Sequence, residues 1–98
     1  MKTLDINSKT WFDKVNGNSY FASVITINYG MTDEKTFKLP FQYGYGSQDE
    51  QEAKAVLTEA NKISTEYGQC LSAYCRDNNI IYRHSNIKGC KKSELKNI

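Results

Sequence analysis

Three cysteines and the single histidine are the residues with the most evident capacity for chemistry. These residues are Cys70, Cys75, His84 and Cys90. Cysteine and histidine can bind zinc, and together they can form a nucleophilic pair. Zinc-binding pairs usually lie two to four residues apart in a tight loop, whereas Cys70 and Cys75 fall on a predicted helix with side chains about 140° apart. No flanking sequence resembles a thiolate-stabilising helix start. We therefore predict no metal site and no Cys–His catalysis. We interpret the cysteines as small buried hydrophobic residues and His84 as a surface side chain.

Acidic residues offer a second possible chemistry, that of paired carboxylates. The acids between Asp49 and Glu52 fall in the first turn of a predicted helix, where capping and the helix dipole explain them. Asp13 could meet Asp33 or Glu34 in space, and the sequence leaves that open. Phosphate-binding loops, dinucleotide fingerprints and serine elbows are absent from the sequence. We therefore predict no enzyme, no catalytic residue and no cofactor.

Tyrosines and basic residues are more suggestive of surface recognition. Together they could combine stacking with positive charge, as in proteins that hold single-stranded nucleic acid. The same types anchor protein interfaces, so composition does not separate the two. The predicted partner-binding residues are Tyr20, Tyr45, Tyr82, Arg83, Lys88, Lys91 and Lys92.

Charge is unevenly distributed along the chain, although the net charge is only +2. The stretch Asp49–Glu66 carries five acids and two lysines, which gives −3. The stretch Arg76–Ile98 carries six bases and two acids, which gives +4. The basic C-terminal quarter suits an anionic partner.

The first half of the chain alternates in the manner of strands. Thr10–Val15, Ser19–Tyr29 and Lys35–Phe41 are predicted strands, and the Asn16-Gly17-Asn18 turn predicts a hairpin between the first two. Residues 1–8 are predicted to be an irregular lead-in. The three strands should form an antiparallel meander. Its core face is expected to carry Phe21, Ile25, Ile27, Tyr29, Phe37, Leu39 and Phe41.

The second half is predicted to be largely helical. A capping box from Ser47 to Glu50 opens a helix over Asp49–Lys62. A break near Ser64 separates it from a further helical stretch, which could also be an extension of the first helix. Ile80–His84 is a predicted fourth strand, and residues 86–98 could add one more short strand. The sequence thus predicts a single α+β domain over residues 1–98, in which one or two helices pack on one face of the meander.

The segment Leu39–Gly46 joins the strand half to the helical half. Pro40 lacks an N–H, and Gly44 and Gly46 permit backbone angles that a side chain would forbid. The turn therefore holds its two tyrosines on a bend. We predict that Tyr43 is structural and that Tyr45 is exposed and functional.

Two blocks carry a resemblance: Trp11–Phe21 (WFDKVNGNSYF) and Pro40–Gly46 (PFQYGYG). They resemble blocks shared by small uncharacterised proteins of bacteriophages. The resemblance implies a phage origin and action in the bacterial cytoplasm. It favours a non-enzymatic protein that inhibits a host component, such as an anti-CRISPR protein acting on a defence nucleoprotein.

Further expectations follow from length and composition. The alternative to an inhibitor is a small accessory protein that binds single-stranded DNA or RNA. No apolar run approaches the roughly 20 residues that a bilayer span needs, so no membrane role is expected. The N-terminus lacks an apolar signal segment and the cysteine count is odd, which favours reduced thiols in a cytosol. A monomer and a homodimer formed through a sheet edge both remain open.

Overall fold

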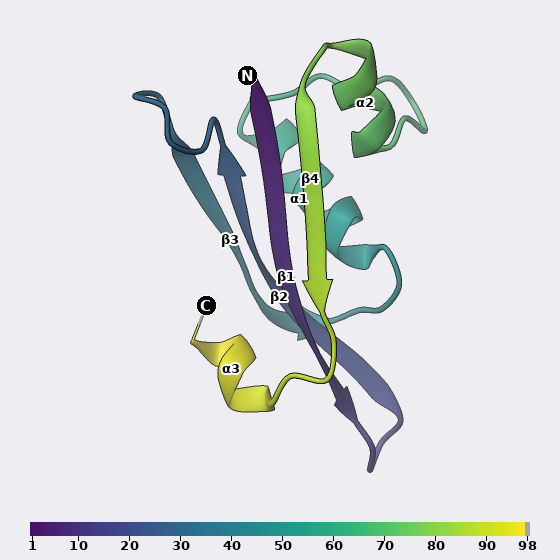
Figure 1. Cartoon of the computed structure of the whole chain (residues 1–98). Coiled ribbons are helices and arrows are strands. Elements are labelled where there is room, and N and C mark those ends of the chain that lie inside the picture. Colours follow the sequence, from purple (N-terminus) through teal and green to yellow (C-terminus); the bar gives the residue numbers. More distant parts are fainter. Residues whose placement is uncertain (98) are drawn as a thin grey trace.

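The computed structural model describes residues 1–97 and confirms an α+β fold around one four-stranded sheet (Figure 1). The strands stand in the order β3-β2-β1-β4, in which β1, β2 and β3 form the antiparallel meander and β4 is parallel to β1. The elements in chain order are β1 (Thr3–Asp13), β2 (Asn18–Ile27), β3 (Lys35–Tyr43), α1 (Gln48–Glu59), α2 (Leu71–Asp77), β4 (Ile81–Ile87) and α3 (Lys92–Lys96).

Strand β1 is one of the two interior strands of the sheet, beside β2, and is longer than predicted. The expectation that residues 1–8 are irregular is wrong, because β1 begins at Thr3 and pairs with a neighbour on each side. Ile6 lies opposite Ile25 of β2 and opposite His84 of β4. Leu4 and Ile6 are fully buried. These two apolar residues, together with hydrogen bonds along both edges, are enough to hold the start of β1 as a strand.

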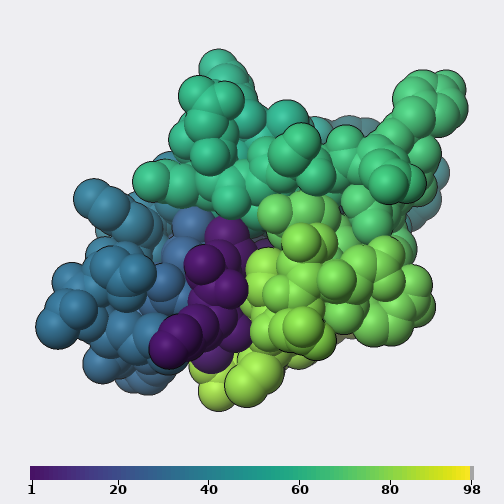
Figure 2. All heavy atoms as spheres, turned by 90° about the horizontal axis from the view of Figure 1, so that it is seen from above, coloured from purple at the N-terminus to yellow at the C-terminus, as the bar shows by residue number. Residues whose placement is uncertain are grey.

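Helices α1 and α2 cover one face of the sheet, here called the inner face. Figure 2 shows the green helical segments gathered on one side of the purple start of β1, with yellow-green atoms of the C-terminal part on the other. The predicted break after the first helix is confirmed, although α1 already ends at Glu59 and α2 starts at Leu71. The inner core consists of Leu4, Ile6, Phe21, Ile25, Ile27, Leu39, Ala53, Leu57, Ile63, Leu71 and Cys75.

The opposite face, here called the outer face, carries the short helix α3. The extra strand considered for residues 86–98 is therefore wrong, because Lys92–Lys96 is helical. Leu95 of α3 is 1% exposed and forms a second cluster with Ala22 and Cys90. Because β2 presents alternate residues to the two faces, Phe21 belongs to the inner core and Ala22 to the outer cluster.

A bulge at Pro40 reverses the facing of β3. Leu39 lies opposite Ser23, but Gln42 lies opposite Phe21, so β3 has one more residue than β2 in this interval. The prediction that Phe41 faces inward is wrong, since it packs on the outer cluster. Pro40 has no N–H to donate, which suits an interruption of the ladder.

Strand β2 ends earlier than the sequence suggested. Tyr29 was expected in the core but is 67% exposed, because β2 stops at Ile27 and Asn28 adopts a φ of 54°. The Asn28 side chain instead accepts hydrogen bonds from the backbone of Lys2 and Thr3. The hairpin between β1 and β2 is confirmed, with Gly17 at a φ of 69° and Val15 in the loop.

Candidate functional site

Five aromatic rings form a continuous surface that we call the aromatic strip: Trp11, Tyr20, Phe41, Tyr43 and Tyr45. Trp11 and Tyr20 are cross-strand partners, and their ring centroids are 5.5 Å apart in a stacked arrangement. The centroids of Tyr20 and Phe41 are 5.0 Å apart, and those of Tyr20 and Tyr43 are 5.8 Å apart. Tyr45 meets Tyr43 edge-on at 6.5 Å. The strip thus runs from the outer face of β1 across β2 to the end of β3.

The accessible end of the strip is made by two tyrosines. Tyr43 is 59% exposed and Tyr45 is 72% exposed, whereas the other three rings are partly buried beside α3. Tyr45 is exposed as predicted. The interpretation of Tyr43 as a cap on the core is wrong, because the bulge at Pro40 turns this residue to the outer face opposite Tyr20.

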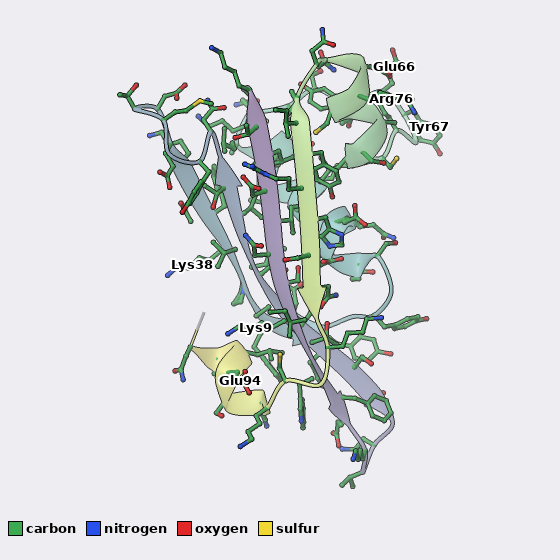
Figure 3. All side chains as sticks on the ribbon, in the orientation of Figure 1. Lys9, Lys38, Glu66, Tyr67, Arg76 and Glu94 are labelled. Carbon is green, nitrogen blue, oxygen red and sulfur yellow. The ribbon has the colours of Figure 1, made fainter. Side chains whose placement is uncertain are left out.

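Lysines of α3 lie over the other end of the strip. The ammonium of Lys92 is 5.5 Å from the ring centroid of Trp11 and 5.8 Å from that of Phe41. Lys96 also approaches Phe41, at 5.8 Å. These are cation–π distances, so the packing holds the two charges close to the rings. Figure 3 shows Lys9 just above α3 and Lys38 projecting from β3, which adds positive charge along the sheet.

The structure brings only some of the predicted partner-binding residues together. Tyr20, Tyr45 and Lys92 belong to the strip or contact it, and Lys91 is the N-cap residue of α3. Trp11, Phe41 and Lys96 were missed, although the predicted hairpin already implied that Trp11 lies close to Tyr20.

The remaining predicted residues lie elsewhere. The guanidinium of Arg83 donates to both carboxylate oxygens of Asp5, at 2.6 and 2.9 Å, so its charge is paired. Tyr82 lies on the inner face, where its hydroxyl donates to Glu50. Burial and the adjacent Glu50 raise the pKa of Tyr82 above its usual value. Lys88 lines a cavity described below.

A buried polar network joins α1 to the inner face. Asp49 is 2% exposed, and one of its carboxylate oxygens, Oδ2, lies 2.6 Å from Ser8 Oγ and 2.6 Å from His84 Nε2. Ser8 and Ser23 face each other across β1 and β2 with their Oγ atoms 2.6 Å apart. Asp49 lies in the first turn of α1 as predicted, where its Oδ1 accepts the backbone N–H of Glu50, but its bonds to Ser8 and His84 were not predicted. The predicted Ser47 cap is wrong, because the Ser47 hydroxyl accepts a hydrogen bond from the Gln51 side chain and caps no backbone N–H. His84 is exposed on β4 as predicted, and its Nε2 also binds this carboxylate.

This network resembles a catalytic site only in composition. In a serine hydrolase the histidine lies between the serine and the acid, whereas here Asp49 lies between Ser8 and His84. Ser8 and Ser23 are at most 2% exposed, which denies a substrate access to either hydroxyl. Asp49, Glu50 and His84 could offer metal ligands within 4.8 Å of one another. Asp49 and His84, however, are already hydrogen-bonded to each other, and Glu50 accepts from the Tyr82 hydroxyl. We therefore interpret the network as structural, joining α1 to β1 and β4.

The other sequence candidates are separated by the fold. Cys75 lies in the inner core and Cys90 in the outer cluster, which confirms burial for these two. Cys70 is exposed, contrary to the prediction, and a hydrogen bond with Ser72 lowers the pKa of its thiol. Asp13 bonds Asn16 in the first hairpin, whereas Asp33 bonds Asn28 at the other end of β2. The fold therefore assembles neither a zinc site from the cysteines nor a site from this pair of carboxylates.

A cavity of about 200 Å³ lies where the β1–β2 hairpin, the β3–α1 connection and the β4–α3 connection meet. Its walls include Phe12, which is 50% exposed, and Tyr45 of the aromatic strip. The chain passes close to the cavity floor at Gly44, where a Cβ would lie only 2.6 Å from the Phe21 ring. The lining is completed by Thr10, Ser19, Phe21, Gly46, Gln48, Asp49, Asn86, Lys88 and Gly89.

Comparison with protein-family models, with curated proteins and with solved structures gave no significant match. None of the helices within residues 1–97 combines the length and the apolar character that a membrane crossing requires.

Proposed function

We propose that the protein binds single-stranded nucleic acid along the aromatic strip. This proposal depends on the chain of ring contacts from Trp11 to Tyr45. Lys92 and Lys96 lie over the Trp11 and Phe41 rings, at the end of the strip beside α3. Stacking surfaces next to positive charge are how single strands are usually held without sequence preference.

The distribution of charge supports an anionic partner on the outer face. Lys92 and Lys96 of α3, together with Lys9 and Lys38 of the sheet, lie on this side, whereas Asp49–Glu66 carries a net −3 on the helical side. Protein interfaces are typically depleted in lysine, so aromatic rings with several lysines favour nucleic acid. In the proposed complex, bases stack on Tyr43 and Tyr45, and phosphates follow the lysines.

Fluorescence anisotropy with a labelled 20-nucleotide single strand at low salt tests this function. Each base–aromatic stack contributes about 1–3 kcal/mol, so Tyr43→Ala should weaken binding by roughly five-fold or more. Tyr67→Ala is the matched control, because Tyr67 is fully exposed but lies between α1 and α2, away from the strip. Replacing both lysines of α3 by glutamine should flatten the salt dependence, by about 0.7 in log–log slope for each phosphate that is no longer neutralised. Absence of any complex with single-stranded DNA or RNA would refute the proposal.

A protein partner is the second candidate, and the resemblance to phage proteins favours inhibition of a host component. The exposed Tyr43 and Tyr45 are also of a type that anchors protein interfaces. A pull-down from nuclease-treated bacterial lysate separates this candidate from the first. If the partner is a protein, the wild type should retain it from the lysate, Tyr45→Ala should fail to retain it, and Tyr67→Ala should retain it as the wild type does. In either case the protein acts by occupying a surface, without turnover.

A further inference from the structure

We infer that the 200 Å³ cavity beside Tyr45 receives one unpaired base of the bound strand. This inference rests on the proposed function and adds a defined subsite to it. The cavity adjoins the exposed end of the aromatic strip, because Tyr45 belongs to both. The cavity is lined by the inner-face residues Phe21 and Asp49, so a strand that stacks on Tyr43 at the outer face reaches it by passing Tyr45 at the end of the strip.

The size and lining of the cavity suit a single planar ring. Pockets for drug-sized ligands usually span roughly 300–1,000 Å³, so the smaller volume here admits one ring system and excludes a stack of two. Phe12 and Tyr45, which are 50% and 72% exposed, supply flat apolar walls, and buried Phe21 lies beneath them. Aromatic side chains lining a pocket are the usual means of holding a base turned out of its strand.

Polar groups in the cavity match the edge of a base. The Asn86 carbonyl oxygen accepts the Thr10 hydroxyl, which directs the Asn86 amide and leaves its N–H groups to donate. The Gln48 amide nitrogen donates to Glu52, so the Gln48 carbonyl oxygen remains an acceptor. The lining thus offers both a donor and an acceptor, and the Watson–Crick edge of a base requires both.

The charge at the mouth fits the phosphate attached to such a base. Lys88 lines the cavity, and within residues 1–97 no carboxylate lies within ion-pair distance of it. Lys91 and Lys92 follow Lys88 in the chain, at the start of α3, and add positive charge to this segment. A neutral aromatic side chain of a protein would leave Lys88 without a partner, which favours a nucleotide.

Two thymidine decamers, one intact and one with a single central abasic site, test the inference by anisotropy at low salt. The wild type should bind the intact strand more tightly, and Phe12→Ala should weaken that binding by roughly five-fold to a hundred-fold. For the abasic strand the effect of Phe12→Ala should be much smaller, because the cavity then has no base to hold. Lys88→Gln is a second variant that leaves the aromatic walls in place, and it should weaken binding of both strands.

Val15→Ala is the matched control, since Val15 is in the same hairpin, 92% exposed and outside the cavity. Circular dichroism of each variant confirms that the fold is retained. If the intact strand binds and Phe12→Ala behaves like Val15→Ala, the cavity inference is overturned while the proposed function stands. If no decamer binds the wild type, both are overturned, and an aromatic side chain of a protein becomes the occupant to test.

Discussion

Replacing Asp49 by alanine should remove a large part of the stability of the domain. Its carboxylate accepts hydrogen bonds from Ser8 of β1 at 2.6 Å and from His84 of β4 at 2.6 Å, so this one side chain joins α1 to two strands of the sheet. A hydrogen bond to a charged group contributes about 1.5–3 kcal/mol. The sum for two such bonds is an upper limit on the stabilisation. The net contribution is smaller, because burying the charge is itself unfavourable and because the His84 side chain, 26% exposed, can turn to water.

We therefore expect Asp49→Ala to lower the free energy of unfolding by about 2–4 kcal/mol, against a total of about 5–15 kcal/mol for a domain. For a chain of this size, that corresponds to a fall of roughly 8–30 °C in Tm. Urea unfolding at pH 7, followed by circular dichroism and by the fluorescence of Trp11, measures the change.

The matched control is Glu52→Ala on the same helix. Within residues 1–97 the one side-chain hydrogen bond of Glu52 is with Gln48 of its own helix, at 2.9 Å, so its replacement should cost less than about 0.5 kcal/mol. A double-mutant cycle with Ser8→Ala should show a coupling of about 1 kcal/mol between Ser8 and Asp49. If the free energy of unfolding of Asp49→Ala lay within about 0.5 kcal/mol of the wild type, the structural role of Asp49 would be refuted.

Two further predictions concern ionisation. Because the pKa of Tyr82 is raised in the folded state, its contribution to stability is fully present below about pH 10 and is lost as the pH rises further. The stability difference between wild type and Tyr82→Phe, measured by urea unfolding from pH 7 to 11, should therefore narrow above pH 10, and a constant difference would contradict the raised pKa. At pH 7.5 iodoacetamide should modify native Cys70 but not Cys75, since burial raises the pKa of Cys75 to about 11. Peptide mass spectrometry that found the two equally labelled would show that α2 opens readily.

The arrangement of the strands was largely accessible from the sequence because it depends on local patterns. Alternation and the Asn16-Gly17 turn identified the meander, and helical periodicity around Ala53 and Leu57 identified α1. The bulge was less accessible, since Pro40 signals an irregularity without giving its direction. The facing of Phe41 and Tyr43 therefore depended on a single inserted residue.

The buried network could not be predicted because it depends on contacts between distant segments. Asp49 reaches Ser8 across 41 positions and His84 across 35. In the sequence, Asp49 stands between Ser47 and Glu50 and is typical of the start of a helix, so nothing local indicates its buried contacts. The available signal was Ser23, a small polar residue at a core-facing position between Phe21 and Ile25. A polar residue in such a place requires a buried partner, although the sequence does not say which.

The parallel pairing of β4 with the interior strand β1 has a consequence for how the chain reaches its folded state. The meander closes over short loops, but contacts such as Arg83 with Asp5 span 78 positions. Long-range pairing of this kind slows folding, because the chain must lose loop entropy before these contacts stabilise it. During synthesis, one edge of β1 remains unpaired until residues 81–87 have left the ribosome, so the nascent chain carries an open strand edge through most of its translation.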